Sequence, residues 1–276
     1  MSPDAYCEAR VAARGSSLYY AILDLPPAQR LAWMALAAFA QEIEATRRAS
    51  NEAEVVGARL DWWSREVAAG GHTAGHPVAQ VLAAAGLAGA GELQVWIAGA
   101  RADLRQTRFL DRAGLLAHYA ERDLAFATLA ARCLELDAAA RPVLAPLARS
   151  LRLVGLIAST GARLRQDEVW LPVADLQATG VSIAQLRRNE YGPAWLALMS
   201  AQARWAREAW AESIEAAGKP LARRLRPFFV LGAIAQRQLG EIESEGFAVL
   251  HQRIELTPMS RFWTAWRTRV LGARPV

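Results

Sequence analysis

The chain contains 276 residues, of which 53% are hydrophobic and 21% are charged. This length allows a large buried core, and the composition excludes an intrinsically disordered chain. The net charge is +5, and nearly all of the positive charge is arginine because Lys219 is the single lysine. The arginines are scattered and form no basic run, so we expect no binding to DNA or RNA.

The two cysteines, Cys7 and Cys133, lie far apart in helix-forming sequence. They predict buried, unpaired thiols in a reduced compartment. Residues 1–14 lack the apolar segment of a secretion signal, and no run of about 18 apolar residues occurs. We therefore expect a cytoplasmic protein, with any membrane contact limited to a peripheral position on the inner membrane face.

Residues of high helix propensity dominate the chain, and strand signals are nearly missing. Apolar residues recur at spacings of three and four, which predicts roughly ten helices. The expected helices span residues 28–49, 52–69, 77–85, 91–107, 111–136, 143–165, 182–189, 193–217, 226–245 and 258–271. No fixed-period repeat or long linker interrupts this pattern. We predict a single all-α domain over residues 1–276.

Several short segments stand in an order that is typical of one enzyme family. They include Leu-Pro-Pro-Ala-Gln-Arg at 25–30, Asp-Trp-Trp-Ser-Arg-Glu at 61–66, Val-Trp-Leu-Pro at 169–172 and Phe-Ala-Val-Leu at 247–250. On these segments the chain resembles the squalene/phytoene synthase family, the head-to-head prenyl synthases. It is most similar to the bacterial presqualene diphosphate synthase branch, and the resemblance covers essentially the whole chain.

The resemblance implies a terpenoid-synthase-like helical bundle around a central cavity, and an activity that joins two prenyl diphosphates. It also implies Mg²⁺, which the family holds with two aspartate-rich motifs on facing helices. Mg²⁺ prefers oxygen ligands at about 2.1 Å. Aspartates at positions i and i+4 lie on one helix face, where they can converge on the metal.

The first motif, counted onward from Phe39, falls on residues 44–48. These residues read Glu-Ala-Thr-Arg-Arg, so Glu44 is the only acid that remains, while Arg47 and Arg48 follow it. A cation beside Mg²⁺ is repelled by about 4 kcal/mol for unit charges 4 Å apart at intermediate screening. The first motif therefore lacks the charge that the metal requires.

The second motif, counted back from Trp170 without a gap, falls on residues 159–163. Ser159 and Arg163 stand where the family has aspartates, and a third family acid is replaced by Arg105, while Asp103 remains. Acids are thus missing at three places. We expect no metal ligands, no cofactor and no confident catalytic residue, the degenerate motif positions being Glu44, Arg48, Ser159 and Arg163.

These substitutions predict a family homologue that has lost Mg²⁺-dependent condensation of prenyl diphosphates. It would act as a prenyl-lipid-binding protein, or as an assembly or partner protein in isoprenoid or membrane metabolism. The resemblance implies a precedent for such a loss, because the family's mitochondrial branch, which is linked to assembly of respiratory complex I, also has weakened acidic motifs. The alternative is an active head-to-head prenyl transferase that forms presqualene diphosphate, squalene or phytoene.

Two further interpretations concern the arginines. They could replace Mg²⁺ as clamps on a prenyl diphosphate, because bidentate contacts between arginine and phosphate are strong. The candidate diphosphate- or substrate-binding residues are Ser16, Ser17, Tyr20, Arg47, Arg48, Asp103, Arg105, Arg122 and Arg163. Alternatively, the motif register is shifted and the true acids are Asp167 and Glu168, or Glu52 and Glu54.

Three of these assignments have ordinary structural alternatives. Ser16 and Ser17 can simply start a helix, and Glu44 and Arg48 can form an i,i+4 ion pair. The aromatic and basic stretch 261–269 is either a helix packed on the bundle, which we favour, or a helix on an anionic membrane surface. Most of the ten tryptophans are expected in the core or cavity wall.

Overall fold

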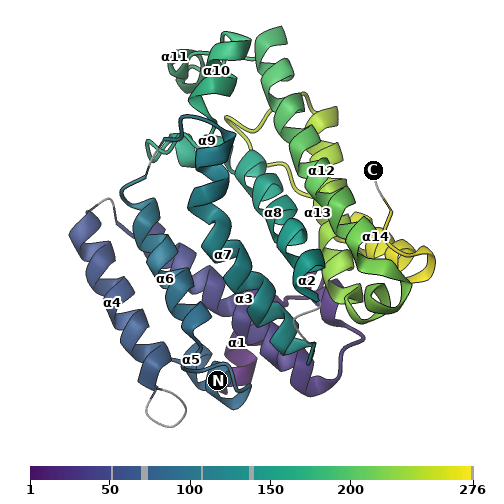
Figure 1. Cartoon of the computed structure of the whole chain (residues 1–276). Helices are drawn as coiled ribbons and strands as arrows, with labels where there is room; N and C mark the ends of the chain where they lie inside the picture. The colour runs from purple at the N-terminus through teal and green to yellow at the C-terminus, as the bar shows by residue number, and fades with distance from the viewer. Residues whose placement is uncertain (51, 70–73, 107, 137–139, 275–276) are drawn as a thin grey trace. The chain divides into compact units, whose positions relative to one another are not determined.

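The computed structural model describes residues 1–50, 52–69, 74–106, 108–136 and 140–274. Within these ranges the chain forms fourteen helices and a single isolated β-bridge, between Arg108 and Val169. The helices are α1 Pro3–Val11, α2 Ser17–Ile22, α3 Pro27–Arg48, α4 Ala53–Ala69, α5 Pro77–Ala84, α6 Gly91–Asp103, α7 Arg112–Cys133, α8 Arg141–Ala158, α9 Thr160–Leu164, α10 Val173–Thr179, α11 Ile183–Arg187, α12 Pro193–Arg224, α13 Arg226–Ser244 and α14 Pro258–Leu271 (Figure 1). The all-α prediction is confirmed.

Most expected helices lie within a few residues of their predicted bounds, and four differences have local causes. The short helices α1 and α10 were not predicted, and α2 was raised only as an alternative interpretation of Ser16 and Ser17, because six to nine residues give little periodicity. The helix expected at 91–107 ends at Asp103, and residue 107 lies outside the described residues. The helix expected at 143–165 is divided at Ser159 into α8 and α9. The helix expected at 193–217 continues to Arg224.

Contacts between Cα atoms divide the chain into two compact units. Unit 1 contains Met1–Arg105 and Glu121–Arg141, and unit 2 contains Gln106–Ala120 and Pro142–Val276. The single domain expected from the sequence stays a prediction.

Helix α3 is the centre of unit 1 because it packs against α1, α4, α5 and α6. Its core side includes Trp33, Phe39 and Ile43, all nearly inaccessible to solvent. Trp63 of α4 packs edge-on against Phe39, with ring centroids 5.8 Å apart. Because this apolar side fixes α3 in its register, the last turn of the helix, which carries the first motif, is fixed as well.

Unit 2 is organised around α12 and α13, which pack against each other, and around α14, which packs on α13 (Figure 1). Its core includes Trp170, Trp195, Trp210 and Phe247. Trp195 donates its indole N–H to the carbonyl of Phe247 at 3.2 Å, so a buried polar group is satisfied. These side chains hold the segment after α13 against the start of α12.

The expectation for the tryptophans is only partly correct. Trp195 and Trp210 are buried, as expected, and Trp205 is half-buried. Trp62, Trp263 and Trp266 are exposed instead. Spacing at helical periodicity places residues on one face of a helix, but it does not say whether that face meets the protein or the solvent.

Gly218 interrupts α12 with φ 57° and ψ 166°, outside the helical region. This conformation is essentially restricted to glycine, because a Cβ atom would collide with the backbone. The helical turns after it end at Arg224, just before Arg226 begins α13. Gly218 therefore sets the direction of the last turns of α12.

Candidate functional site

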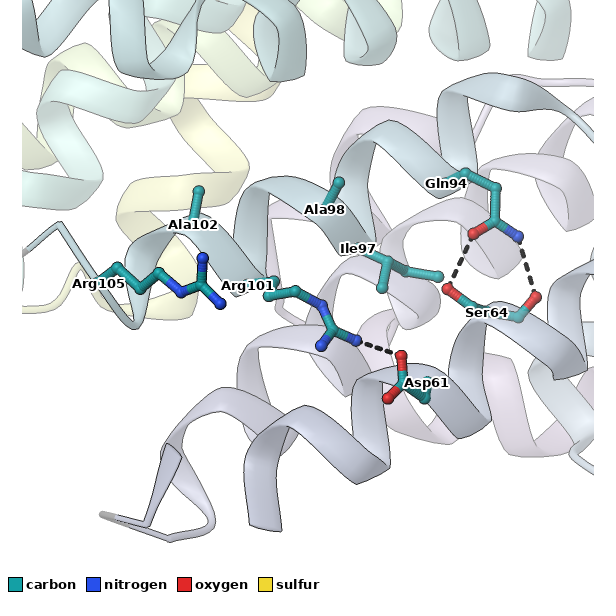
Figure 2. A pocket seen from close by; sticks show the side chains of 8 residues that line it. All are labelled: Asp61, Ser64, Gln94, Ile97, Ala98, Arg101, Ala102 and Arg105. Carbon is teal, nitrogen blue, oxygen red and sulfur yellow. Dashed lines mark hydrogen bonds and ion pairs between the residues drawn. The ribbon is translucent and has the colours of Figure 1, made fainter. Parts of the chain in front are cut away.

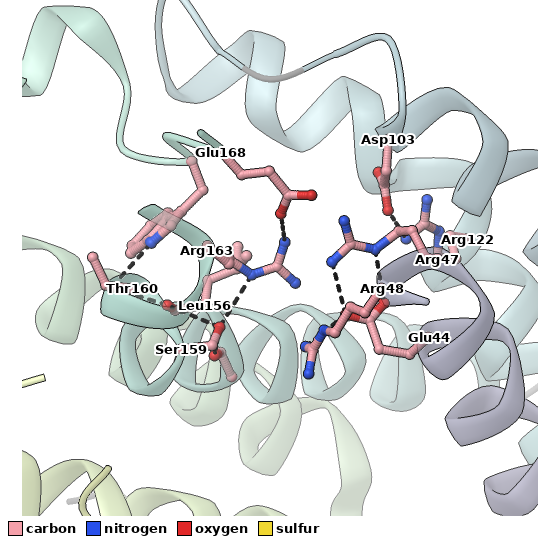
Figure 3. Close-up of polar contacts among 12 residues, drawn as sticks. Glu44, Arg47, Arg48, Asp103, Arg122, Leu156, Ser159, Thr160, Arg163 and Glu168 are labelled. Carbon is pink, nitrogen blue, oxygen red and sulfur yellow. Dashed lines mark hydrogen bonds and ion pairs between the residues drawn. The ribbon is translucent and has the colours of Figure 1, made fainter. Parts of the chain in front are cut away.

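The first motif lies in the last turn of α3, and its charged side chains bind one another (Figure 3). Glu44 accepts two hydrogen bonds from Arg47, at 3.1 Å from Nε and 2.9 Å from Nη2. The same carboxylate forms an ion pair with Arg48 at 2.6 Å, so the expected i,i+4 pair is present. The single remaining acid of this motif is thus shared by two cations.

Arg47 is an unusual member of this cluster because only 2% of its side chain is exposed. A buried guanidinium is costly unless it is paired, and Glu44 supplies the pair through both of its oxygen atoms. The neighbouring Thr46 accepts a hydrogen bond from the indole of Trp63 at 3.2 Å, which ties this turn to α4. Arg47 therefore belongs to the packed interior of unit 1.

Asp103 and Arg122 form a second pair, at 2.9 Å, and both side chains are only 9% exposed. Asp103 ends α6, and Arg122 lies in the part of α7 that belongs to unit 1. Gly99, one turn before Asp103, leaves room for the guanidinium, since a Cβ atom there would collide with Arg122. No pattern in the sequence indicates this role of Gly99. Asp103 and Arg122, both predicted to bind substrate, thus neutralise each other's charge.

Arg105 lies apart from these pairs and lines a hollow of about 460 Å³ between α4 and α6 (Figure 2). Across the hollow, Ser64 donates to the side-chain oxygen of Gln94 at 2.9 Å, and Gln94 donates to the Ser64 carbonyl at 2.9 Å. Asp61 forms an ion pair with Arg101. These polar groups satisfy one another and connect the two helices.

The second motif lies in unit 2, at the break between α8 and α9. Ser159 donates its hydroxyl to the Gly155 carbonyl at 2.6 Å, and it adopts φ −101° and ψ 7°. Gly161 then packs directly against the backbone of Val249 and Leu250, and its N–H donates to the Val249 carbonyl at 3.2 Å. Ser159 therefore lies at a break and Arg163 lies in the short helix after it, so the two motif positions are not on one continuous helix.

Arg163 is held by its own surroundings in unit 2 (Figure 3). It donates to Glu168 at 2.9 Å and to the Ser159 hydroxyl at 3.1 Å. Glu168 was considered only as a metal ligand in a shifted register, and its role as the partner of Arg163 was missed. The neighbouring Asp167 is exposed and pairs with Arg187 at 2.6 Å. Neither acid is arranged as a metal ligand.

The serines near the N-terminus start a helix. Ser16 is the N-cap of α2, and its hydroxyl accepts a hydrogen bond from the Tyr19 N–H at 3.1 Å. Ser17 and Tyr20 lie in this short helix and are half-buried, and the rings of Tyr19 and Tyr20 meet edge-on at 5.3 Å. The helix-start interpretation of Ser16 is confirmed, whereas a role for these residues in binding diphosphate stays a prediction.

The donor atoms in the described ranges do not fit a magnesium cluster. No group of three or more histidine, cysteine, aspartate or glutamate side chains there is placed to hold a metal ion. Mg²⁺ is normally held by several carboxylates together with substrate phosphates, and Glu44 alone remains at the motif positions. The residues thus do not fit the ion that the resemblance implies.

The two cysteines offer no alternative chemistry. Both are buried thiols without a disulfide, as expected. Burial raises the pKa of Cys7 to about 11 and the pKa of Cys133 to about 12. The reactive thiolate is therefore scarce near neutral pH, and neither side chain is suited to act as a nucleophile.

Comparisons with known proteins identify relatives of this arrangement. A family model described as squalene/phytoene synthase matches residues 11–260. A crystal structure of a dehydrosqualene synthase in complex with ligand has a similar fold, with a TM-score of 0.85, 16% sequence identity and coverage of 98% of this chain and 96% of that chain. Squalene synthase HpnC from Alicyclobacillus acidocaldarius gives a TM-score of 0.72 at 16% identity, over 89% of this chain and 94% of that chain. No curated protein matches the sequence.

Proposed function

Because the chain belongs to the squalene/phytoene synthase family, we propose that it is a member that has lost Mg²⁺-dependent condensation of prenyl diphosphates. It acts instead as a prenyl-lipid-binding protein or as an assembly partner. One observation carries the proposal: Arg47, Arg48 and Arg163, which occupy motif positions, are each bound to a carboxylate of their own unit.

The charge at the first motif supports the loss of catalysis. Glu44 with Arg47 and Arg48 carries a net positive charge, whereas ionisation of a prenyl diphosphate requires a negative site that attracts Mg²⁺. A divalent cation placed here would be repelled by at least about 4 kcal/mol for each arginine at 4 Å. One acid shared by two arginines cannot offset this repulsion.

The second motif supports the same conclusion through its backbone. Ser159 and Arg163 provide no carboxylate, and the helix is broken where Gly161 meets Val249 and Leu250. Restoration of two aspartates would still leave them on a discontinuous helix. The missing carboxylates and the break in the helix therefore support the same conclusion.

The same ion pairs argue against arginines that clamp a diphosphate. Arg122 is paired with Asp103 and Arg163 with Glu168, so a phosphate would have to displace a carboxylate from each. Arg105 forms no ion pair within the described residues, but it faces the hollow between α4 and α6. The clamp remains a second candidate because Arg48 is 44% exposed and reachable.

Incubation of the purified protein with farnesyl diphosphate and Mg²⁺ tests the proposal. We expect the substrate to be recovered unchanged, while a dehydrosqualene synthase run in parallel consumes it. Formation of presqualene diphosphate, of squalene when NADPH is added as hydride donor, or of phytoene when geranylgeranyl diphosphate replaces farnesyl diphosphate would overturn the proposal and establish the alternative, an active prenyl transferase.

Calorimetric titration with farnesyl diphosphate and with farnesol, both without metal, tests the binding function and the clamp. Comparable affinity for both ligands supports recognition of the prenyl chain. A strong preference for the diphosphate that is lost in Arg48→Ala and Arg163→Ala would support the clamp instead. Absence of binding by either ligand would leave the assembly function and remove lipid binding.

A further inference from the structure

The apolar and polar side chains of helix α14 are distributed in the reverse of the way that is normal for a surface helix. A surface helix buries its apolar side and exposes its polar side. The buried residues of α14 are Ala265 and Thr268, and Thr264 is half-buried beside them. The large apolar side chains of the same helix are exposed. They are Met259, Phe262, Trp263, Trp266, Val270 and Leu271.

The polar side of α14 can face the protein because its hydroxyls are satisfied within the helix. Thr264 donates to the Ser260 carbonyl and Thr268 to the Thr264 carbonyl, both at 2.8 Å. These small residues allow close packing on α13. The orientation is therefore set by a well-made contact, and the exposed face is not the result of poor packing.

The exposed residues form one continuous apolar face. Met259, Phe262, Trp263, Trp266 and Val270 follow one another at intervals of three, one, three and four residues, which places them together on the helix surface. The ring centroids of Trp263 and Phe262 are 5.5 Å apart, and those of Trp263 and Trp266 are 5.6 Å apart. Trp263 is 55% exposed and Trp266 is 48% exposed.

Positive charge borders this face, and negative charge is absent from the segment. Residues 256–276 contain four arginines and no aspartate or glutamate. At about 100° per residue, Arg267 and Arg269 lie on opposite edges of the apolar face. An amphipathic helix with aromatic residues in the middle and arginines at the edges is suited to an anionic lipid interface.

Two hollows beside α14 extend the positive border. One, of about 320 Å³, is lined by Arg237, Arg267 and Arg274, and the other, of about 380 Å³, by Arg223, Arg226 and Arg269. No acidic residue lines either hollow. Each has room for a phosphate group, since a single water occupies only about 30 Å³.

Two of the three arginines of the first hollow remain available for a ligand. Within the described ranges no carboxylate pairs with Arg267 or Arg274, whereas Arg237 pairs with Glu241 at 3.2 Å. The indole of Trp210 donates to the Arg274 carbonyl at 3.0 Å, which fixes the chain after α14 beside this hollow. The charge is therefore positioned by the fold.

We propose that the apolar face of α14 docks on a bilayer surface that contains anionic lipids, with phosphate headgroups in the two arginine-lined hollows. Phe262, Trp263 and Trp266 enter the headgroup–acyl boundary, where aromatic side chains are favoured. The arginines contribute the preference for anionic over neutral lipid. No described helix is long and apolar enough to cross a membrane, so the attachment is at the surface. The proposal rests on α14 and its neighbours and is independent of the loss of condensation.

Co-sedimentation of the full chain with vesicles tests the proposal. We expect binding to phosphatidylcholine vesicles that contain phosphatidylglycerol, little binding to phosphatidylcholine alone, and weaker binding at high salt. Trp263→Ala with Trp266→Ala should reduce the partition coefficient about tenfold. Arg267→Gln should reduce it about fivefold on the anionic vesicles only.

Matched variants outside α14 control for general effects of losing a tryptophan or an arginine. Trp62→Ala removes an exposed tryptophan of α4, and Arg188→Gln removes an exposed arginine after α11. Both should bind vesicles as the unaltered protein does, and circular dichroism should show that all variants remain folded.

Three results would overturn the proposal. They are failure to bind anionic vesicles, binding that Trp263→Ala with Trp266→Ala leaves unchanged, and a dimer in analytical ultracentrifugation that this double variant abolishes. The last result would assign the face to a second copy of the chain.

Discussion

The two regions of this protein that hold the motif positions differ in charge and in backbone. In unit 1, the end of α3 is an intact helix that keeps Glu44 and adds Arg47 and Arg48. In unit 2, both motif acids are absent, and the helix itself is interrupted between α8 and α9. The first region is a regular helix end with a net positive charge, whereas the second has no carboxylate at its motif positions and its helix is interrupted.

This difference indicates what each region now contributes. The first region, taken together with the end of α6 and the neighbouring part of α7, is a set of ion pairs, the most buried of which is Asp103 with Arg122. The second region depends on a close backbone contact at Gly161, and its ion pair between Arg163 and Glu168 is partly buried. Substitutions should therefore destabilise the first region through unpaired charge and the second through steric conflict.

The largest effect is expected for Asp103→Asn in the first region. It leaves the buried Arg122 without its carboxylate, which should cost about 3–5 kcal/mol of unfolding free energy. Asp61→Asn is the control, because Asp61 pairs with Arg101 in a more exposed position and should cost less than about 1 kcal/mol. Urea unfolding followed by circular dichroism measures both. Equal losses in the two variants would show that burial does not decide the strength of these pairs.

The next effect belongs to the second region. Gly161→Ala places a methyl group against the Leu250 carbonyl and should cost about 1–3 kcal/mol, because the backbone has to shift. Gly155→Ala, in α8, meets nothing within 4 Å and should be neutral or stabilising by up to about 1 kcal/mol. The same denaturation experiment compares them. A Gly161→Ala variant as stable as the Gly155→Ala variant would refute the tight contact.

Two adjacent acids give a sharper test of the second region. Glu168→Gln should cost about 1.5 kcal/mol, because it removes the charged acceptor of Arg163. Asp167→Asn should change stability by less than about 0.5 kcal/mol, since its pair with Arg187 is exposed and asparagine tolerates its φ of 59°. Thermal unfolding distinguishes the two. A larger loss in Asp167→Asn would reverse our assignment of the structural acid.

The smallest effect is expected where the first region meets solvent. Arg48→Gln removes an i,i+4 pair with Glu44 that is worth about 0.3 kcal/mol. A double-mutant cycle of Glu44→Gln and Arg48→Gln isolates this coupling free energy. A coupling above about 1 kcal/mol would mean that Arg48 is part of the buried pair network with Arg47.

The sequence predicted the helices that contain strong periodicity, as the bounds of α3 and α14 illustrate. It also located the substituted motifs and the i,i+4 pair of Glu44 with Arg48. It could not predict the break at Ser159, because that break depends on Gly161 meeting a segment nearly ninety residues later at Leu250. The orientation of α14 was not predictable either, because helical periodicity groups apolar residues on one face but does not show whether that face packs on the protein or meets solvent.

Gly218 links backbone conformation to the surface charge of unit 2. Its φ and ψ values are accessible to glycine alone, and they set the direction of the turns that deliver Arg223 to the hollow beside α14. A residue with a side chain at this position would redirect those turns and remove a charge from the hollow without altering any arginine. In the proposed docked state, the lipid preference of the surface would then depend on a backbone torsion of Gly218, which itself lines neither hollow.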